Sequence, residues 1–288
     1  MNKTMTSHEL EVYEAYNTDL DFETMHYEGK GAYPYAKYRM EQVLEILEKY
    51  KCKKILDLGC SAGTLVREWI LRGNEGIGID LSEKLISQGK GKIQKLGLDS
   101  DCLMVGNAKD LAMFENESFD AVIALGLYTF MTEEEEITGY KDIARILKPK
   151  GLLITGFLNE LVNMFTLNRY TVETFAKIID VYGLSESERN KVLSEYKTLL
   201  TNPDLPPSKS SDFYRRMHNP LTIKDLFTSV GYKTIDIFFC KFFAYPPLME
   251  KNIEFFDQSC RKLEKTYARE WYSYFLAHAF CAVAETDK

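Results

Sequence analysis

Two carboxylates flank a glycine-rich turn in the first half of the chain and could together bind a nucleotide-like ligand. Residues 54–63 read Lys-Ile-Leu-Asp-Leu-Gly-Cys-Ser-Ala-Gly, an apolar strand that runs into a turn of small residues. Asp57 lies two residues before Gly59, and Asp80 comes 21 residues after that glycine. A carboxylate at Asp57 would repel a pyrophosphate but attract a cationic amino group, whereas an acid at Asp80 suits ribose hydroxyls.

The elements that position these acids predict an α/β protein. The turn joins a strand at 55–58 to a helix that begins at Thr64. Ser82 is a predicted helix cap, although Gly89 and Gly91 weaken that helix, and Thr132 with Glu135 forms a capping box. Strands alternating with helices indicate a parallel, doubly wound sheet. The further predicted strands are 75–80, 102–105, 119–125, 152–158, 233–240 and 277–285.

Residues 50–158 resemble the class I S-adenosylmethionine-dependent methyltransferases, and the resemblance resumes near residue 220. The family's motif acid-x-Gly-x-Gly-x-Gly reads Asp57-x-Gly59-x-Ser61-x-Gly63 here, with Ser61 in place of the middle glycine. Segments 118–120 and 144–151 also match the family. The resemblance implies a Rossmann-like sheet of seven strands in the order 3-2-1-4-5-7-6, with the last strand antiparallel.

The resemblance also implies which residues bind S-adenosylmethionine, which leaves as S-adenosylhomocysteine. Asp57 and the loop after it would hold the methionine portion, and Asp80 would bind the ribose hydroxyls. Asn107 stands where the family usually has an acid facing the adenine. The predicted cofactor residues are Asp57, Gly59, Cys60, Ser61, Gly63, Asp80, Leu81, Asn107, Ala108 and Leu125.

The acceptor side is less readable from the sequence. Tyr128 follows the fourth strand and either lines the acceptor pocket or packs at the entry of the next helix. His26, His218 and Tyr214 are candidate general bases because they lie in segments that could close over the pocket. The adjacent arginines 215 and 216 either pair with an anionic acceptor or belong to a solvated loop.

These residues predict methyl transfer to an oxygen or nitrogen of a small or medium-sized acceptor by in-line displacement. The net charge of −7 argues against a large nucleic-acid interface. A nicotinamide-dependent oxidoreductase is a rival on the same fold, but its fingerprint would need glycines where the chain has Ser61 and Thr64. A module that binds S-adenosylmethionine without transferring its methyl group is the third hypothesis.

Three parts of the chain are expected. Residues 1–50 form a helical cap that either packs on the sheet edge or folds over the cofactor as a lid. Residues 51–158 and 220–288 form the cofactor-binding core. Residues 159–219 form a helical insertion, which either binds the acceptor or is an ornament with a solvated loop.

Cysteine and histidine spacing predicts no metal site, because six cysteines show no C-x-x-C pair and four histidines show no ligand spacing. No signal segment and no run of 18 apolar residues is present, so no membrane span and a cytoplasmic location are expected. The oligomeric state stays open.

Overall fold

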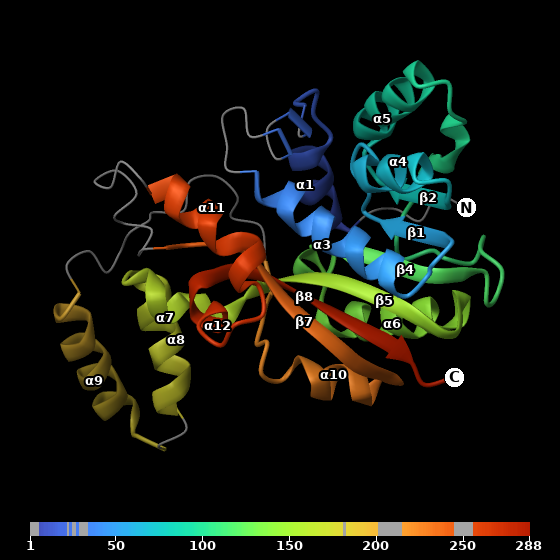
Figure 1. Cartoon of the computed structure of the whole chain (residues 1–288). Helices are drawn as coiled ribbons and strands as arrows, with labels where there is room; N and C mark the ends of the chain where they lie inside the picture. Colours follow the sequence, from blue (N-terminus) through green and yellow to red (C-terminus); the bar gives the residue numbers. More distant parts are fainter. Residues whose placement is uncertain are drawn as a thin grey trace.

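The computed structural model describes residues 6–21, 23–24, 27–28, 34–180, 183–200, 215–244 and 256–288. Its centre is a twisted sheet in the order β3-β2-β1-β4-β5-β8-β7 with helices on both faces (Figure 1). The strands are β1 Lys54–Leu58, β2 Glu75–Asp80, β3 Leu103–Val105, β4 Phe119–Leu125, β5 Leu147–Asn159, β6 Met217–His218, β7 Tyr232–Phe242 and β8 Ala277–Thr286.

The predicted topology is confirmed. β1 to β5 pair in parallel, and β8 inserts antiparallel between β5 and β7. The short strand β6, which was not predicted, adds a parallel pair at the end of β5. β5 begins at Leu147, earlier than the predicted residue 152, because its pairing with β4 shifts register and accommodates Lys150 at a φ of 59°.

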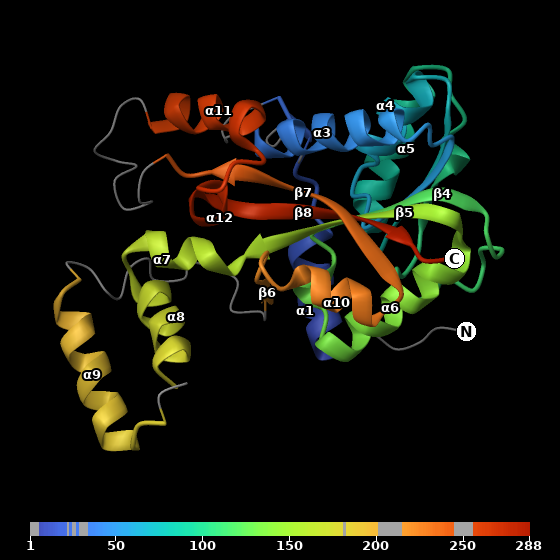
Figure 2. The ribbon, with the colours of Figure 1, turned by 60° about the horizontal axis from the view of Figure 1, so that its bottom comes forward.

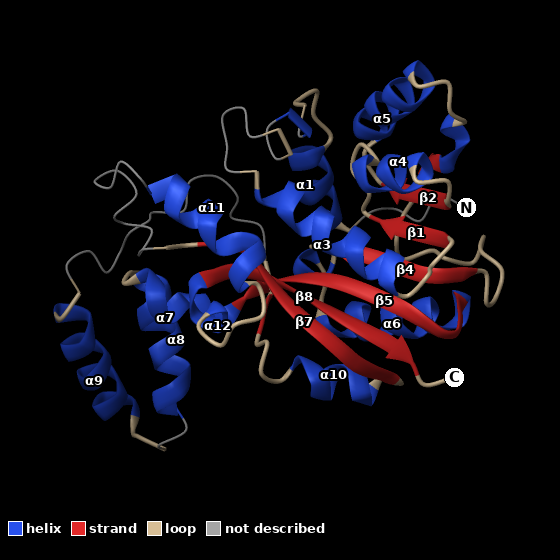
Figure 3. Ribbon diagram, in the orientation of Figure 1, coloured by secondary structure: helices blue, strands red, loops and turns tan. Residues whose placement is uncertain are grey.

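Helices cover the sheet in two layers, which Figure 2 shows from the side and Figure 3 shows by element type. The helices on one face are α3 Tyr35–Lys49, α4 Thr64–Leu71 and α11 Phe256–Tyr267, and α6 Glu133–Ile146 and α10 Ile223–Ser229 lie on the other. α5 Glu83–Lys95 lies beside β3. Alternate residues of β4 point into the two cores, Ile123 into one and Val122 into the other, as expected for a strand buried on both faces.

Three α-helices follow β5 in the described part of the insertion. They are α7 Asn163–Thr166, α8 Arg169–Asp180 and α9 Glu186–Thr198. α8 and α9 pack through stacked rings of Phe175 and Tyr196, whose centroids lie 4.1 Å apart. Both helices stand to one side of the sheet, beyond the β5 end (Figures 1 and 2).

Close packing explains why a glycine, Gly89, lies inside helix α5, where glycine is normally destabilising. A Cβ built on Gly89 of α5 would lie 2.4 Å from the carbonyl oxygen of Ala62, in the turn after β1. A Cβ on Gly91, two residues further, would meet nothing within 4 Å. Gly89 therefore lets α5 approach the turn, whereas Gly91 carries only the entropic cost of glycine in a helix.

The two glycines are a matched pair for mutation. Gly89→Ala should destabilise the protein by about 1–3 kcal/mol, since the helix must move off the turn. Gly91→Ala should stabilise it by about 0.5–1 kcal/mol through helix propensity. Urea denaturation of the two variants measures both changes. Equal effects of the two substitutions would show that α5 does not press on the turn.

None of the helices in the described ranges is long and apolar enough to cross a membrane.

Candidate functional site

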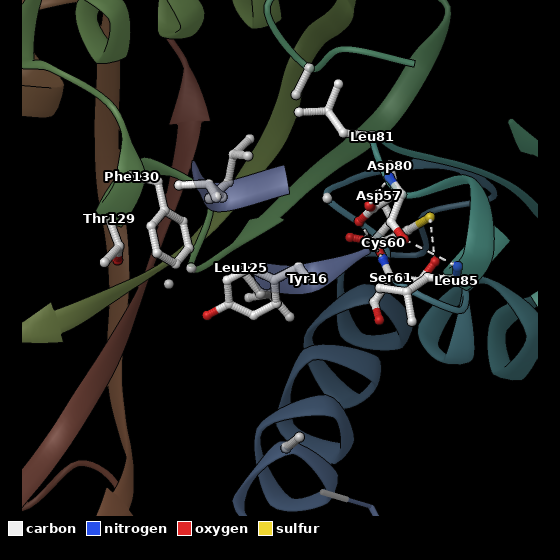
Figure 4. A pocket seen from close by; sticks show the side chains of 18 of the residues that line it. Tyr16, Asp57, Cys60, Ser61, Asp80, Leu81, Leu85, Leu125, Thr129 and Phe130 are labelled. Carbon is white, nitrogen blue, oxygen red and sulfur yellow. Dashed lines mark hydrogen bonds between the residues drawn. The ribbon is translucent and has the colours of Figure 1, made fainter. Parts of the chain in front are cut away.

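A cavity of about 560 Å³ opens at the carboxyl ends of the parallel strands. In α/β sheets this edge is where ligands bind. Figure 4 shows Asp57, Cys60, Ser61 and Asp80 at one end of the cavity, Thr129 and Phe130 at the other, and Tyr16 and Leu125 between them. The cavity therefore joins the predicted cofactor loop to the loop after β4.

The turn after β1 has an alternating backbone. Gly59, Ser61 and Gly63 have φ values of 73°, 53° and 67°, all in the left-handed region that favours glycine. Ser61 thus occupies the middle glycine position of the motif in the conformation that a glycine would take. A side chain at this φ costs of order 1–2 kcal/mol, which the surrounding contacts must offset.

Asp80 fixes this turn from the end of β2. One carboxylate oxygen accepts a hydrogen bond from the Ser61 N–H at 2.8 Å, and the other accepts from the Ser82 N–H at 2.9 Å. Burial raises the pKa of Asp80, whereas these two hydrogen bonds lower it. Each oxygen keeps a further lone pair, so the carboxylate can still accept from ligand hydroxyls.

Asp57 has no such partners. Its side chain is 5% exposed, lines the cavity, and makes no hydrogen bond or ion pair with any residue of the described ranges. Burial, helped by the charge of Asp80, raises the pKa of Asp57 to about 7, although Arg39 acts in the opposite direction. An isolated buried carboxylate of this kind is stabilised when a cation enters beside it.

The N-terminal segment lies against the same end of the cavity. Helix α1, Ser7–Tyr16, lines it with Val12, Tyr13 and Tyr16. Polar contacts anchor the segment: the Ser82 hydroxyl donates to Asn17 at 2.9 Å, and Lys92 lies 2.8 Å from Glu23, which also pairs with Arg67. These contacts join the segment to α4 and α5 around the turn.

All predicted cofactor residues except one line the cavity. The exception is Gly63, which caps α4 and whose Cβ would lie 2.5 Å from Leu103, so this glycine serves packing. The predicted residues in the lining are Asp57, Gly59, Cys60, Ser61, Asp80, Leu81, Asn107, Ala108 and Leu125.

Tyr128 does not reach the cavity, so its prediction as an acceptor-pocket residue is corrected. Its side chain is 2% exposed and lies in the core, with its ring 4.6 Å from that of Tyr140. A Cβ on Gly139 would lie 2.9 Å from its hydroxyl, so the glycine makes room for it. The next two residues, Thr129 and Phe130, line the cavity instead.

The histidine predictions need correction too. His218 is buried outside the cavity, with Nε2 donating to Glu136 at 3.0 Å and its ring 4.4 Å from that of Phe157. Arg216 pairs with the same carboxylate at 2.7 Å, so it binds inside the protein and not to an acceptor. His26 and Tyr214 lie outside the described residues.

Several cavity residues escaped the sequence reasoning. They come from the segment before α3, from α3, from the end of β7 and from the start of β8, and carried no motif. The antiparallel insertion of β8 is what brings the last two elements to the cavity, and only the folded topology shows this. The missed residues are Tyr27, Tyr35, Arg39, Lys241 and His278.

No three potential metal ligands gather within the part of the chain that the structure describes.

Comparison with known proteins finds a methyltransferase domain within the chain. Residues 55–151 match the family model described as a methyltransferase domain. A ubiquinone biosynthesis O-methyltransferase of Chromobacterium violaceum is 29% identical over 40% of this chain and 48% of its own length. A 24-methylenesterol C-methyltransferase of Oryza sativa is 28% identical over 40% of this chain and 31% of its own length. The chain thus covers less than half the length of these relatives.

Solved structures share the whole fold. The magnesium protoporphyrin IX methyltransferase of Synechocystis, solved with bound SAH, superposes with a TM-score of 0.55 at 12% identity, covering 96% of this chain and 98% of that one. A Pyrococcus horikoshii protein superposes with a TM-score of 0.53 at 18% identity over the same shares. Residues 55–151 therefore match a methyltransferase domain, and the acid-and-glycine turn and the strand order agree with the fold of the class I S-adenosylmethionine-dependent methyltransferases.

Proposed function

We propose that this protein transfers the methyl group of S-adenosylmethionine to an oxygen or nitrogen of a small or medium-sized acceptor. The observation that carries the proposal is the buried carboxylate of Asp57, which has no partner among the described residues and lies in a cavity beside the glycine turn. S-adenosylmethionine supplies an electrophilic methyl group on a positively charged sulfur and leaves as neutral S-adenosylhomocysteine.

The residues at the acidic end of the cavity fit the two ends of the methionine portion. We assign the amino group to Asp57 and the carboxylate to Arg39, whose Nε is buried without a hydrogen-bond partner among the described residues. Arg39 is close enough to Asp57 to lower its pKa. A carboxylate and a guanidinium that line the same cavity complement a zwitterionic amino acid.

The remaining cofactor roles follow the order of the strands. Asp80, at the end of β2, accepts from the ribose hydroxyls, and Asn107 and Ala108 after β3 face the adenine beside Leu81. Leu125 ends β4, so we place the reacting methyl group near it, between the cofactor loop and the acceptor end. The protein's work is to hold the acceptor in line and to exclude water.

Among the described histidines, His278 is the best placed to accept a proton from the acceptor. It lines the cavity, and its Nδ1 is buried without a partner among the described residues. Burial, with the charges of Lys241 and Arg215, holds its pKa well below the usual value, so the imidazole is neutral at pH 7. A neutral imidazole can take up the proton that the acceptor's O–H or N–H loses.

The outer parts of the chain receive roles by their position. We propose residues 1–50 as a lid over the cofactor, since α1 lines the cavity and is anchored around the turn. Within the described part of residues 159–219, only Arg215 lines the cavity, so the acceptor contact of the insertion is placed at its end.

The relatives' names, an O-methyltransferase for ubiquinone synthesis and a sterol C-methyltransferase, support a small-molecule acceptor. Six unpaired cysteines suit the cytoplasm.

Asp80→Asn should weaken S-adenosylhomocysteine binding by about 1.5–3 kcal/mol, the worth of hydrogen bonds to a charged acceptor. Asparagine keeps one oxygen for the backbone, so the turn should still form. Isothermal titration measures the affinity, with Asp101→Asn as an exposed control in the short 3₁₀ helix before β3. Unchanged affinity in Asp80→Asn would remove the ribose role.

The experiment that tests the proposed function uses isotopically labelled methyl donor. Purified protein is incubated with labelled S-adenosylmethionine and the small-molecule fraction of a cell extract, and products are separated by chromatography. We expect a labelled small molecule that is absent with the Asp57→Asn variant. Tight S-adenosylhomocysteine binding without any labelled product would instead indicate a silent binding module, and stabilisation by a nicotinamide cofactor alone would indicate an oxidoreductase.

A further inference from the structure

We infer that the end of the cavity opposite Asp57 binds a carboxylate of the acceptor, through Lys241 and Arg215. This inference rests on the proposed methyl transfer and names the acceptor class: an acid with an apolar body and a hydroxyl or amino group.

The strand order separates two kinds of charge along one sheet edge. The acids Asp80 and Asp57 end the neighbouring strands β2 and β1. On the other side, Lys241 lies near the end of β7 and His278 near the start of β8. β4 and β5 lie between the two groups and contribute Leu125 and the residues 156–158 to the cavity. A ligand for the acids and a ligand for the cations can therefore meet over β4.

The backbone at Lys241 has an unusual conformation, which positions its side chain at the cavity. Its φ is 59°, an unfavourable value for a lysine inside a strand. The carboxylate of Glu264 in α11 accepts hydrogen bonds from the N–H groups of Lys241 at 2.8 Å and Phe242 at 3.3 Å. Glu264 is fully buried, so these two hydrogen bonds to its side chain hold the bend from within the protein. The ammonium group of Lys241 then lies 5.0 Å from the centre of the Tyr35 ring, which lines the cavity.

The charge of Lys241 has no carboxylate partner among the described residues. Lys241 makes no ion pair with a carboxylate of the described residues, and the charged side chains that act on it electrostatically, Arg215 and Arg39, are also cations. Burial, together with these two, lowers the pKa of Lys241 to about 8, although Cys240 acts in the opposite direction. A half-buried lysine charge without a carboxylate partner in the described structure is stabilised by an anion that enters beside it.

Arg215 is held at the cavity by its neighbour. The N–H of Arg216 donates to the carbonyl of Thr129 at 2.8 Å, and its guanidinium pairs with the buried Glu136. This anchor places the guanidinium of Arg215 5.9 Å from the centre of the Phe130 ring, at the cavity wall. Arg215 is exposed and can adjust to a ligand, whereas Lys241 is held from the backbone.

The cavity wall between Asp57 and Lys241 indicates what the rest of the acceptor is like. It is mainly apolar and aromatic and offers the body of the acceptor a surface to pack on. Its residues are Leu125, Leu127, Phe130, Met131, Phe157 and Leu158. Burial is the main cause of the low pKa of His278, and the charge of Lys241 lowers it further. An acid paired with Lys241 would offset this second effect, so acceptor binding would favour proton acceptance by His278.

The test compares acids with their uncharged amides. The protein is saturated with S-adenosylhomocysteine, and titration calorimetry measures binding of four probes: benzoate, 4-hydroxybenzoate, 3-phenylpropionate and octanoate, each beside its primary amide. We expect at least one acid to bind about ten- to a hundredfold more tightly than its amide, the worth of a charge-assisted hydrogen bond. Lys241→Met should reduce that preference to about twofold or less.

The controls separate this inference from the proposed function. Lys233→Met removes an exposed lysine from the other end of β7 and should keep the preference for the acid. If Lys241→Met does not fold, Arg215→Met, at an exposed position, provides a second variant in which the preference for the acid over its amide is measured. If no acid binds better than its amide, or if both variants keep the preference, the inference is wrong while methyl transfer stands. If the wild type does not bind S-adenosylhomocysteine, the proposed function itself fails.

Discussion

Asp57→Asn should lose cofactor binding and yet make the ligand-free protein more stable above neutral pH. Loss of the carboxylate leaves the amino group of the ligand buried without a counter-charge, which should weaken S-adenosylhomocysteine binding by about 2–5 kcal/mol. In the ligand-free protein the same carboxylate, when ionised, destabilises the folded state, because it is buried without a partner in the described structure.

The pH dependence follows from the direction of the pKa shift. Folding raises the pKa of Asp57 from 3.8 to about 7. Its contribution to stability is therefore fully present below about pH 4 and is lost as the pH rises through 7. Asparagine has no such loss, so the stability gained by Asp57→Asn should grow between pH 5 and pH 8, to on the order of 2–4 kcal/mol.

Thermal denaturation across this pH range measures the effect, with Asp101→Asn as the control. Asp101 is an exposed acid whose removal should leave both affinity and the pH profile as in the wild type. A ligand-free Asp57→Asn protein that is less stable than the wild type at pH 8 would mean that Asp57 holds the fold together, contrary to its unpaired environment.

Glu136→Gln should be the most destabilising single change outside the cavity. The carboxylate is fully buried and accepts hydrogen bonds from Tyr140, Arg216 and His218. In Glu136→Gln, the buried donors face an amide instead of a carboxylate. The free energy of unfolding should fall by about 2–4 kcal/mol, somewhat less than when one partner of a completely buried ion pair is removed. Because the same carboxylate anchors Arg216, the variant should also weaken binding of acidic acceptors through Arg215.

The pH dependence of the stability that Glu136 contributes has the opposite sign to that expected at Asp57. Burial raises the pKa of Glu136, but the hydrogen bonds and charges of His218 and Arg216 prevail and hold it below its usual value. The stabilisation is present above the unfolded pKa near 4.5 and is lost as the pH falls through the lower folded value. The difference in urea stability between wild type and Glu136→Gln should therefore be constant from pH 6 to 8 and shrink in acid.

Glu134→Gln provides the control, since this exposed glutamate occupies the same first turn of α6. It should change stability by less than about 0.5 kcal/mol. Equal effects at the two positions would contradict the structural role assigned to the cluster around His218.

Residues close in the chain made the cofactor end predictable. Asp57, Gly59 and Asp80 belong to one strand–turn–helix–strand unit, so their spacing alone brings them together. The capping box of Thr132 and Glu135 likewise fixed the start of α6 from four adjacent residues. Local geometry of this kind needs no knowledge of the rest of the fold.

The acceptor end was not predictable, because it forms from residues far apart in the chain. Tyr128 follows β4 as expected, but a short 3₁₀ turn points its side chain into the core and leaves the next two residues at the cavity. Lys241 and His278 carry no local pattern, and meet Asp57 at one edge only because β8 inserts between β5 and β7. The cation cluster thus depends on long-range topology.

Proton release on ligand binding tests the central claim most directly. The cationic amino group of S-adenosylhomocysteine should ionise Asp57, whose pKa is about 7 in the ligand-free protein. Titration calorimetry at pH 7 in buffers of different ionisation enthalpy should therefore show release of on the order of half a proton per site by the wild type, and none by Asp57→Asn where residual binding is measurable. Binding that is as tight in Asp57→Asn as in the wild type, with the same heat in every buffer, would contradict the account.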